Sequence, residues 1–583
     1  MVVASLAGRA IPSPAGMTRL DLAGAPPFLQ ALLDAEDLPG VVLGHAAARP
    51  DTPFLVLERE GQPAATVTYA TLAARAQGYA AAFDARGLTP GSLVALLLVA
   101  HPDLAPAFLG AMMAGLIPSL FPPMSPRIDP AVFWPAQRGV LLGIDPALIV
   151  TDARHAAELR RFLPELATPI VDVDDGPGEG CLPAPRAAPD GIAFLQHSSG
   201  TTGAKKGVIL GHRAVLDFTA ALATALRARP DDVIVSWLPL YHDMGLIGCL
   251  VLPMLLGLTI VQLDPFEWVT RPVSLLQAIE RHRATLCWMP NFAFHHLIRT
   301  LPAEARHDLS SMRAFIDCSE PCKPETLALF RDRFAASGLG AHALQVSYGM
   351  AENVFIATQT DMTADPRVVT ADREAYATER AIRDAAPDAP ALSFLGVGAP
   401  IPGTRIRILG DDGATLGDRR VGQIAVASPY LFGGYFRRPR PDTLTDDGWY
   451  LTGDLGFTLD GEVFVCGRMD DLLIVNGRNI YAHDVEYLIN RETAVKPGRC
   501  VAVGPFNPRA GSQALVVIAE SEDTDETARQ ALRRQIRTLV QAGFGVTAHD
   551  VRVVATGWLV KTTSGKISRE ANLRRYAEDA AAG

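Results

Sequence analysis

The chain has 583 residues, of which 49% are hydrophobic and 20% are charged, a composition typical of globular proteins with several folding units that excludes a wholly disordered polypeptide. Asp and Glu (63 residues) outnumber Lys and Arg (53), and the formal net charge of −10 repels polyanions, which argues against nucleic-acid binding. Seven cysteines without a CxxC pair predict neither disulfides nor a zinc site.

Two segments bear on the location of the protein. Residues 1–30 contain no continuous apolar block followed by a cleavage site, so we expect no secretory signal and a cytoplasmic protein. Residues 244–261 form an uncharged run long enough to span a membrane. Because Gly245, Pro253 and Gly257 interrupt this run, we interpret it as a buried helix that leads into a strand, not as a transmembrane segment.

Helical and strand-like segments alternate over residues 54–150. An Ala-rich amphipathic stretch at 69–86 predicts a helix, and short apolar runs at 93–98 and 147–150 predict strands. The same alternation recurs over residues 191–346. Strands are predicted there at 192–195, 233–237, 285–289 and 315–317, with helices between them. This alternation predicts an α/β fold with layered, mostly parallel sheets.

The pattern changes after Gly396 to strict alternation between charged and apolar residues, as at 405–408. Asp412-Gly413 and Asp460-Gly461 have the sequence of hairpin turns. We therefore predict a small antiparallel, β-barrel-like unit at about 397–467.

A charged step at 468–471 follows this unit and precedes a strand-like run at 472–475. We place a domain boundary near Asp470. The predicted domains are an N-terminal domain at 1–469 and a smaller C-terminal domain of helices and strands at 470–583.

A loop rich in Ser, Thr and Gly follows the predicted strand at 192–195. Its small side chains and hydroxyls let the backbone wrap phosphate oxygens while a lysine adds positive charge, which is one way in which proteins hold a nucleotide tail. The spacing is not that of a Walker loop, and a flexible turn is the alternative. The predicted phosphate-binding residues are Ser198, Ser199, Gly200, Thr201, Thr202, Gly203 and Lys206.

Four strings further along the chain occur, together with this loop, in an order typical of one superfamily. They are Ser347-Tyr348-Gly349-Met350-Ala351-Glu352, Tyr450-Leu451-Thr452-Gly453-Asp454, Gly467-Arg468-Met469-Asp470-Asp471 and Thr563-Ser564-Gly565-Lys566. From about residue 46 to 576 the chain resembles the acyl-adenylate-forming, AMP-binding enzymes, which include acyl-CoA synthetases, luciferases and peptide-synthetase adenylation domains. The resemblance implies a large layered α/β N-terminal domain and a small, mobile α+β C-terminal domain.

Within that superfamily the chain more closely resembles the fatty acyl-AMP ligases. The strings that resemble theirs are residues 236–245, 290–294 and 477–481. Residues 366–394 resemble the insertion that separates these ligases from acyl-CoA synthetases, where it is thought to hinder the movement or binding that CoA needs. The alternative for this segment is a solvated surface helix at 372–384 with no functional consequence.

The resemblance implies ATP-dependent activation of a fatty acid, or a related carboxylate, as acyl-AMP with release of pyrophosphate. Negative charge then builds on the α-phosphate oxygens. Lys566 matches the family's lysine that stabilises this charge, Glu352 matches the acid that helps to hold Mg²⁺, and Thr202 is the second residue implied at the metal. The alternatives are a solvent-exposed tail charge for Lys566 and a helix cap for Glu352.

Nucleotide and acyl contacts are also implied by the resemblance. Asp454 matches the ligand of the ribose hydroxyls and Arg468 the basic residue beside the ribose or the phosphates, although the two could instead form a structural salt bridge. His242 matches a residue near the acyl carboxylate, with a core histidine as the alternative. The residues implied to line the adenine and the adenylate are Ser319, Glu320, Pro321, Ser347, Tyr348, Gly349 and Met350, with Tyr348 able to stack on the base.

Asp470 occupies the family's hinge position, where a few backbone torsions let the C-terminal domain rotate between adenylation and thioester formation. The family's acceptor is the phosphopantetheine thiol of an acyl carrier protein. The alternatives are an acyl-CoA synthetase and a non-catalytic acyl- or nucleotide-binding homologue. Three residues depart from the family pattern: Lys205 replaces Pro, Gln423 replaces Glu, and Cys318 replaces a Gly where the backbone is expected to pass the adenine.

Overall fold

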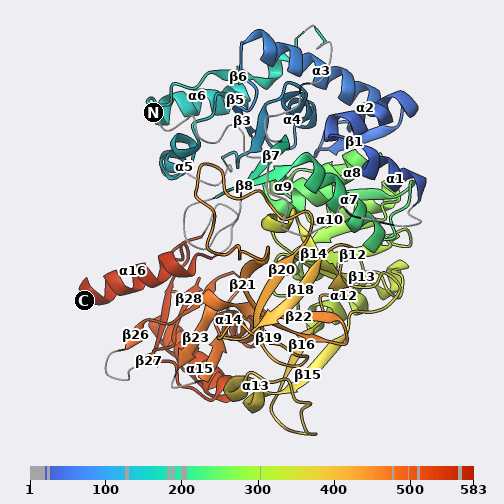
Figure 1. Ribbon diagram of the computed structural model, residues 1–583. Helices are drawn as coiled ribbons and strands as arrows, with labels where there is room; N and C mark the ends of the chain where they lie inside the picture. The colour runs from blue at the N-terminus through green and yellow to red at the C-terminus, as the bar shows by residue number, and fades with distance from the viewer. Residues whose placement is uncertain are drawn as a thin grey trace.

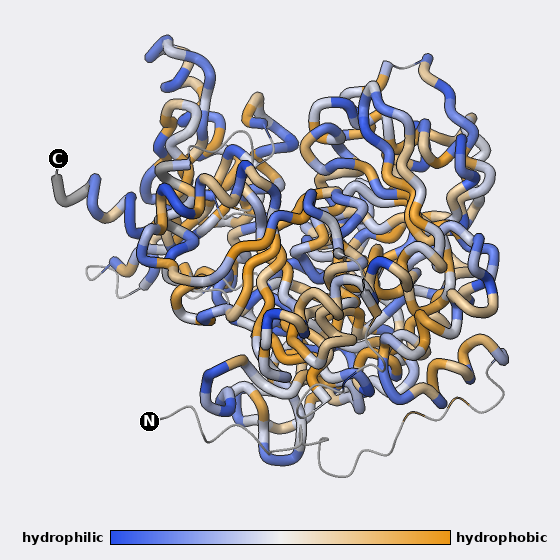
Figure 2. Tube along the Cα trace, turned by 90° about the horizontal axis from the view of Figure 1, so that it is seen from above, coloured by the Kyte–Doolittle hydropathy of each residue, from blue (hydrophilic) through white to orange (hydrophobic). Residues whose placement is uncertain are grey.

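The computed structural model describes residues 20, 22, 26–124, 130–178, 180–181, 186, 191–197, 206–302, 304–475, 478–496, 498–507, 512–561 and 567–582. Figure 1 shows two large sheets with their helices in the upper and right-hand parts of the molecule, and the C-terminal strands and helices at the lower left. Apolar segments gather inside and hydrophilic segments outside, as Figure 2 shows. The α/β class predicted from the sequence is confirmed.

The larger of the two sheets has nine strands within the described residues, and those in its middle are parallel. These inner strands are short and apolar, as expected where helices cover both faces of a sheet. Antiparallel strands close both edges. In spatial order the strands are β17 (Ala399–Pro400), β14 (Ile356–Gln359), β13 (Leu344–Gly349), β12 (Ala314–Asp317), β11 (Leu286–Met289), β9 (Val233–Ser236), β10 (Thr259–Leu263), β1 (Pro53–Glu58) and β2 (Ala65–Thr68).

The second sheet has six strands within the described residues. Five of them are parallel, and β8 pairs antiparallel with β7 at one edge. In spatial order they are β6 (Ile170–Asp172), β5 (Leu148–Thr151), β3 (Leu93–Leu97), β4 (Ile117–Leu120), β7 (Ile192–His197) and β8 (Gly207–Gly211).

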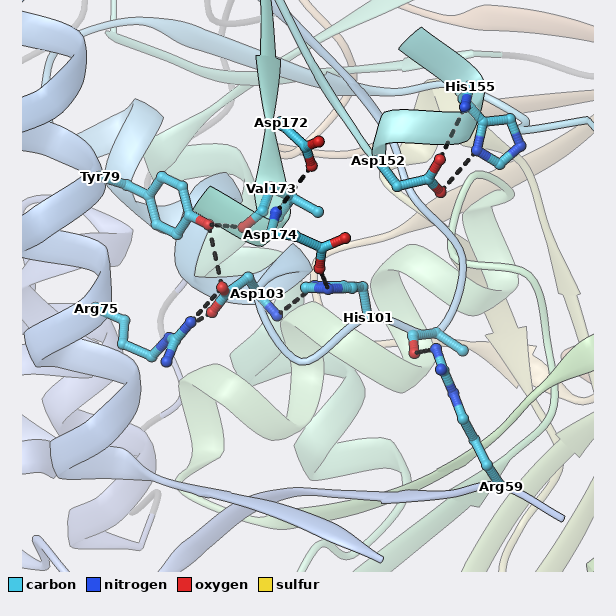
Figure 3. A network of polar contacts seen from close by, with 11 residues as sticks. Arg59, Arg75, Tyr79, His101, Asp103, Asp152, His155, Asp172, Val173 and Asp174 are labelled. Atoms are coloured by element: carbon cyan, nitrogen blue, oxygen red, sulfur yellow. Dashed lines mark hydrogen bonds and ion pairs between the residues drawn. The ribbon is translucent and has the colours of Figure 1, made fainter. Parts of the chain in front are cut away.

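A polar network closes the carboxyl ends of β3, β5 and β6 (Figure 3). The guanidinium of Arg75 binds both carboxylate oxygens of Asp103, and the hydroxyl of Tyr79 donates to the same carboxylate at 3.2 Å. The backbone N–H of Asp103 donates to Nδ1 of His101, so Nε2 of that ring carries the proton toward Asp174 at 3.3 Å. This network fastens helix α3 (Tyr69–Ala85) to the loop after β3 and contains none of the predicted site residues.

Helices cover both sheets, and several begin where the sequence supplies a cap. The side chain of Thr68 accepts from the N–H of Thr71 at the start of α3, and that of Asp152 accepts from the N–H of His155 at the start of α6. The helices before residue 340 are α1 (Pro27–Asp34), α2 (Leu38–Ala48), α3 (Tyr69–Ala85), α4 (Leu104–Met113), α5 (Pro130–Ile144), α6 (Ala153–Phe162), α7 (His212–Ala225), α8 (Leu252–Leu256), α9 (Pro265–Thr270), α10 (Val273–His282), α11 (Asn291–Thr300) and α12 (Pro324–Phe334), with short 3₁₀ turns at η1 (Val173–Asp175) and η4 (Ala335–Ser337).

The uncharged run at 244–261 is buried, as its Gly and Pro residues predict. It forms a π-helix, η3 (Met244–Val251), then α8, and then enters strand β10. A side chain at Gly245 would collide with the carbonyl of Pro239, so this close approach requires glycine. Among the described residues, no helix is both long and apolar enough to cross a membrane.

Residues after Gly396 form the predicted antiparallel unit. Within the described residues its order is β19 (Thr415–Leu416), β18 (Arg405–Leu409), β20 (Gly422–Ala427), β21 (Tyr450–Leu459) and β22 (Glu462–Arg468). The predicted turn at Asp460-Gly461 joins β21 to β22, and both of its residues have positive φ, as a type I′ hairpin turn requires.

The segment at 366–394 is a strand–helix–strand unit rather than a solvated surface helix. Strands β15 (Val368–Asp372) and β16 (Ala391–Leu395) pair antiparallel around a short helix, α13 (Arg373–Glu379). The ring of Tyr376 is buried at 5% exposure and lies 5.0 Å from Phe394 and 6.3 Å from Tyr481. The helix therefore packs against the C-terminal part of the chain.

After the turn η6 (Met469–Asp471), the C-terminal residues build small sheets around their own apolar side chains. One hydrophobic cluster lies entirely within residues 473–551 and a second within 501–576, whereas Tyr481 belongs to a cluster shared with the antiparallel unit. The boundary near Asp470 stays a prediction. The elements are β23 (Leu472–Val475), β24 (Arg478–Tyr481), α14 (Ala482–Glu492), β25 (Cys500–Val503), β26 (Phe506–Asn507), β27 (Ser512–Gln513), β28 (Val516–Ser521), α15 (Glu526–Phe544), β29 (Asp550–Ala555) and α16 (Arg569–Ala582).

Candidate nucleotide and acyl site

Two neighbouring parallel strands, β12 and β13, end beside each other and carry the predicted adenine-lining residues. Ser319, Glu320 and Pro321 follow β12, whereas Ser347, Tyr348 and Gly349 are the last residues of β13 and Met350 follows. Ligands of open α/β sheets bind at the carboxyl ends of strands. The structure therefore brings both predicted groups to the edge of the sheet where a ligand is expected.

The loop after β12 is held by contacts to two other segments. Ser319 has φ of 71°, a left-handed conformation that is uncommon outside glycine, and its hydroxyl lies 3.8 Å from the sulfur of Met244. The carboxylate of Glu320 accepts from the backbone N–H of Phe292 at 3.1 Å. These contacts join the loop to the starts of η3 and α11.

The chain reverses just after β13. Val354 has φ of 63°, and the carbonyl of Phe355 consequently returns to accept from the N–H of Met350 at 2.6 Å. A side chain at Gly349 would collide with the same carbonyl. This turn, η5 (Ala351–Asn353), follows β13 and buries Glu352.

Tyr348, Asp454 and Arg468 form a chain of contacts across the site. The hydroxyl of Tyr348 donates to Oδ2 of Asp454 at 2.6 Å, and Nε of Arg468 lies 3.3 Å from Oδ1 of the same carboxylate. Asp454 on β21 and Arg468 on β22 are register partners in one hairpin. The predicted ribose ligand and the predicted basic residue are thus side by side, within reach of the adenine-lining strand.

Asp454 is held in place by contacts of its own backbone with the neighbouring Thr452. Its backbone N–H donates to the hydroxyl of Thr452 at 3.0 Å, and that hydroxyl donates to the carbonyl of Ile424 at 2.8 Å. Burial raises the pKa of Asp454, whereas Arg468 and the hydrogen bond from Tyr348 oppose this change. Burial and the nearby Asp454 also raise the pKa of Tyr348, so its phenol stays a neutral donor.

Glu352 is the second polar centre of the site and is 8% exposed. The hydroxyl of Tyr435 donates to its Oε1 at 2.7 Å. Burial raises the pKa of the Glu352 carboxyl, and the negative charge of Asp243 adds to this, while the hydrogen bond from Tyr435 acts in the opposite direction. The ammonium of Lys206 lies 4.8 Å from the centre of the Tyr435 ring, a cation–π distance.

A short loop connects Glu352 to the strand that follows the predicted phosphate loop. The N–H of Phe432 donates to the carbonyl of Glu352, and Gly433, Gly434 and Phe436 exchange backbone hydrogen bonds with β8. The predicted phosphate loop joins β7 to β8 as a hairpin connection. Residues 198–203, which include the predicted metal ligand Thr202, and Lys205 lie outside the described residues.

His242 lies in the turn between β9 and η3, with its ring 4.7 Å from that of Tyr241. The next residue, Asp243, is close enough to both other segments for its charge to act on Glu352 and on Cys318. The predicted acyl-side residue therefore borders the same site.

Two of the departures from the family pattern are placed by the structure. The side chain of Cys318 is fully buried in the hydrophobic core, and burial, followed by the charge of Asp243, raises the pKa of its thiol to about 12. The thiol points into the core and not into solvent. Gln423 lies on β20, paired with Leu409 and Leu455.

The two remaining site predictions concern the C-terminal part. Lys566 lies outside the described residues, although Lys561 and Ile567, which flank its segment, form an isolated bridge. Asp470 is the middle residue of η6. Its neighbour Asp471 accepts from Arg569 at 2.7 Å.

Sequence reasoning missed Tyr435, Asp243 and Thr452, which contact or act on predicted residues. Tyr435 follows the pair Gly433-Gly434, and such a pair is a local signal that another segment of backbone approaches closely. Asp243 acts on Glu352 and Cys318, which are far from it in the sequence, so its part could not be read locally. Thr452 accepts from the N–H of Asp454 two residues further on.

The comparisons with known proteins agree with this arrangement. The family model described as AMP-binding enzyme matches residues 43–436. The chain is 30% identical to the long-chain-fatty-acid–AMP ligase FadD26 of Mycobacterium marinum, over 93% of this chain and 97% of the relative. It is 32% identical to 4-hydroxyphenylalkanoate adenylyltransferase of the same species, over 84% and 82%. A solved structure from work on fatty acyl-adenylate ligases of E. coli and L. pneumophila superposes with a TM-score of 0.87 at 28% identity, covering 94% of this chain and 99% of that one.

Proposed function

The chain belongs to the AMP-binding enzyme family, related within it to fatty acyl-AMP ligases, and from this membership we propose that it uses ATP to activate a fatty acid as acyl-AMP with release of pyrophosphate. A carboxylate oxygen of the acid bonds to the α-phosphorus, and the bond from that phosphorus to the oxygen bridging the β-phosphate breaks. The mixed anhydride stays on the enzyme and pyrophosphate leaves.

The contact chain from Tyr348 through Asp454 to Arg468 is the observation that carries this proposal. A buried carboxylate fixed by a phenol and a guanidinium presents acceptor oxygens to adjacent hydroxyls, as the ribose of a nucleotide requires. The adenine then lies over the ends of β12 and β13. We assign the binding of the phosphates to Lys206 and residues 198–203.

Glu352 is the residue that would hold Mg²⁺. Its buried carboxylate is a hard oxygen ligand, and Mg²⁺ is commonly bound by one or two carboxylates together with substrate phosphates. Across the part of the chain that the structure describes, there is no cluster of three or more His, Cys, Asp or Glu side chains that would form a full protein cage. The residues present therefore fit a metal shared with ATP, whose charge neutralises that of the phosphates; Thr202 is the proposed second ligand.

The acyl side of the reaction uses His242 and Lys566. We place His242 beside the carboxylate of the acid and Lys566 beside the α-phosphate, where its charge lowers the energy of the transition state. Residues 470–583 form a small domain that carries this lysine and turns about Asp470 between the two half-reactions.

The second half-reaction transfers the acyl group to a thiol. The sulfur bonds to the acyl carbon, the bond from that carbon to the phosphate oxygen breaks, AMP leaves and the thiol proton is released. The proposed acceptor is the phosphopantetheine of an acyl carrier protein, and the reaction takes place in the cytoplasm.

Mass spectrometry of the products tests the proposal. Intact protein with ATP, Mg²⁺ and dodecanoate is expected to form dodecanoyl-AMP and pyrophosphate, and Lys566→Ala is expected to slow this by at least a hundredfold. Because one relative is named for 4-hydroxyphenylalkanoates, 4-hydroxyphenylpropionate belongs in the same assay. Failure of every acid tested to release pyrophosphate would favour a non-catalytic binding protein.

The acceptor is tested separately with CoA and with a phosphopantetheinylated acyl carrier protein. Thioester on the carrier and little acyl-CoA are the expected result. Rapid acyl-CoA formation would replace the carrier with CoA in the proposal and leave adenylation intact.

A further inference from the structure

One partly buried ion pair crosses the predicted domain boundary next to the adenine-lining loop. Lys323 directly precedes α12. It lies two residues after Pro321, the last residue of the string Ser319-Glu320-Pro321. Its ammonium lies 2.8 Å from Oδ1 of Asp484 on α14. The two side chains are only 18% and 25% exposed.

The charges of this pair match their surroundings. Burial would lower the pKa of Lys323, but Asp484 outweighs it, so the lysine's pKa is raised. Burial would raise the pKa of Asp484, but the charge of Lys323 outweighs it, so the pKa of this carboxyl is lowered. Burial itself lowers the pKa of His483 to about 4, so this neighbour is neutral at physiological pH and Lys323 is the cation that balances Asp484.

The ring of Tyr487, one turn further along α14, lies 5.4 Å from the same ammonium. Lys323 therefore makes both an ion pair and a cation–π contact with a single helix. Both contacts join the nucleotide side of the molecule to the C-terminal part.

Other contacts across this boundary are weaker or more exposed. Arg478 lies 3.2 Å from Glu374, but the side chain of Glu374 is 63% exposed, and exposed ion pairs contribute little. The side-chain amide of Asn479 donates to the carbonyl of Ala377 at 3.0 Å. Lys323 and Asp484 thus form the most buried charged contact among these.

We propose that Lys323 and Asp484 form a latch that holds the C-terminal part in one of its two working arrangements and thereby sets how the enzyme divides its time between adenylation and acyl transfer. This inference rests on the proposed function. Rotation about Asp470 carries Asp484 away with α14, whereas Lys323 stays beside the adenine-lining loop. A charge that stays partly buried after its partner has moved away is left uncompensated, and the arrangement in which the two charges meet is favoured by that difference.

Lys323 is also well placed to sense the nucleotide. Glu320, three residues earlier, accepts from the start of α11, so the loop from Ser319 to Lys323 is held at both of its ends. A ligand that shifts this loop shifts the ammonium. The pair is therefore a positioning device and not part of the chemistry.

Neutral variants of each partner test the latch in the full-length protein. In Lys323→Met and Asp484→Asn, ATP–pyrophosphate exchange with dodecanoate and single-turnover transfer of dodecanoyl-AMP to pantetheine are expected to change in opposite directions. The ratio of the two rates is expected to shift at least fivefold. The exchanged double variant Lys323→Asp with Asp484→Lys is expected to recover most of that shift.

Lys496→Met is the matched control, because it removes a lysine from an exposed ion pair with Glu522 that lies entirely within the C-terminal part. Its rate ratio is expected to stay within twofold of the parent. Equal losses of both rates in the latch variants, an unchanged ratio, or no recovery in the exchanged variant would overturn the proposal.

Backbone hydrogen exchange separates this test from that of the proposed function. Amides of α14 are expected to exchange at least threefold faster in Lys323→Met than in the parent, whether or not any acid is activated. Unchanged exchange would overturn the latch even in an active enzyme, whereas a parent protein that forms no acyl-AMP contradicts the proposed function instead.

Discussion

Glu352 is buried with a carboxyl whose pKa is raised, so its charge depends on the few groups around it. The hydrogen bond from Tyr435 favours the ionised form. A carboxylate that holds Mg²⁺ must be ionised, and activity at low pH is consequently limited by this equilibrium. The hydroxyl of Tyr435 therefore extends the working range of the site toward acid.

Tyr435→Phe tests this argument. Removing the donor raises the pKa of Glu352 further, and the acid limb of the profile of kcat/KM against pH is expected to move to higher pH by about one unit. Activity lost at low pH returns as the pH rises. Tyr430→Phe is the control, since the hydroxyl of Tyr430 contacts Thr404 and Pro402 instead. An acid limb shared by the parent and Tyr435→Phe would contradict the role of the hydrogen bond.

Tyr348→Phe tests the ribose side. The variant removes a hydrogen bond to the carboxylate of Asp454, worth about 1–1.5 kcal/mol, and is expected to raise the KM for ATP by roughly tenfold with a smaller effect on kcat. Steady-state kinetics at saturating fatty acid measure both constants. Tyr79→Phe removes a comparable Tyr–Asp bond in the remote network of Figure 3 and is expected to leave the KM unchanged. Equal KM values for all three proteins would exclude the Tyr348 hydroxyl from nucleotide binding.

At the scale of elements, the turn after β13 shows how little freedom the site has. Because a side chain at Gly349 would meet the carbonyl of Phe355, Gly349→Ala is expected to lower the free energy of unfolding by about 2–4 kcal/mol. Urea unfolding followed by fluorescence measures the change. Gly139→Ala, on α5 with open space around it, is the control and is expected to be neutral or slightly stabilising. Equal stability of Gly349→Ala and the parent would mean that the turn can relax.

Six strands of the two large sheets, namely β3, β5, β7, β9, β11 and β12, could be predicted from the sequence to within one or two residues at each end. Short apolar runs bounded by polar or turn residues are local signals, as at β11 and β12, and they require no knowledge of the partner strand. The end of β12 followed from the same kind of pattern, whereas no separate strand was predicted at β13. The adenine-lining residues were instead implied by the resemblance of their strings to the acyl-adenylate-forming enzymes, and their role stays a prediction.

Other features depend on contacts far apart in the chain. The hydrogen bond from Tyr435 to Glu352 joins residues separated by 83 positions. No local sequence pattern near either residue predicts this bond. The π-helix η3 arises where Gly245 meets the Pro239 carbonyl, while helix propensity alone predicts an α-helix. Helix α13 ends earlier than the predicted range 372–384 because Arg380 takes a left-handed conformation with φ of 51°.

At the scale of the whole molecule, the C-terminal part has apolar clusters of its own, so we expect it to unfold separately. Ile489→Ala removes a fully buried side chain from the cluster within residues 473–551 and is expected to destabilise that part by about 2–5 kcal/mol. Scanning calorimetry is expected to show one transition moving to lower temperature while the other stays in place.

Leu216→Ala, in the cluster of the larger part, is the complementary control and is expected to move the other transition. A single transition that moves as a whole in both variants would show that the two parts unfold together and would contradict the boundary near Asp470.

The register of the hairpin β21–β22 brings the proposed ribose ligand close to the proposed hinge. Asp454 and Arg468 face each other across β21 and β22, and Arg468 stands two positions before Asp470. In the proposed function, a ribose held by that carboxylate steadies the arginine opposite and, through it, the strand that leads to the proposed hinge at Asp470. Departure of AMP removes the restraint. The fluorescence of a dye attached at exposed Met469 is then expected to change when AMP binds or leaves, so that it reports each turnover.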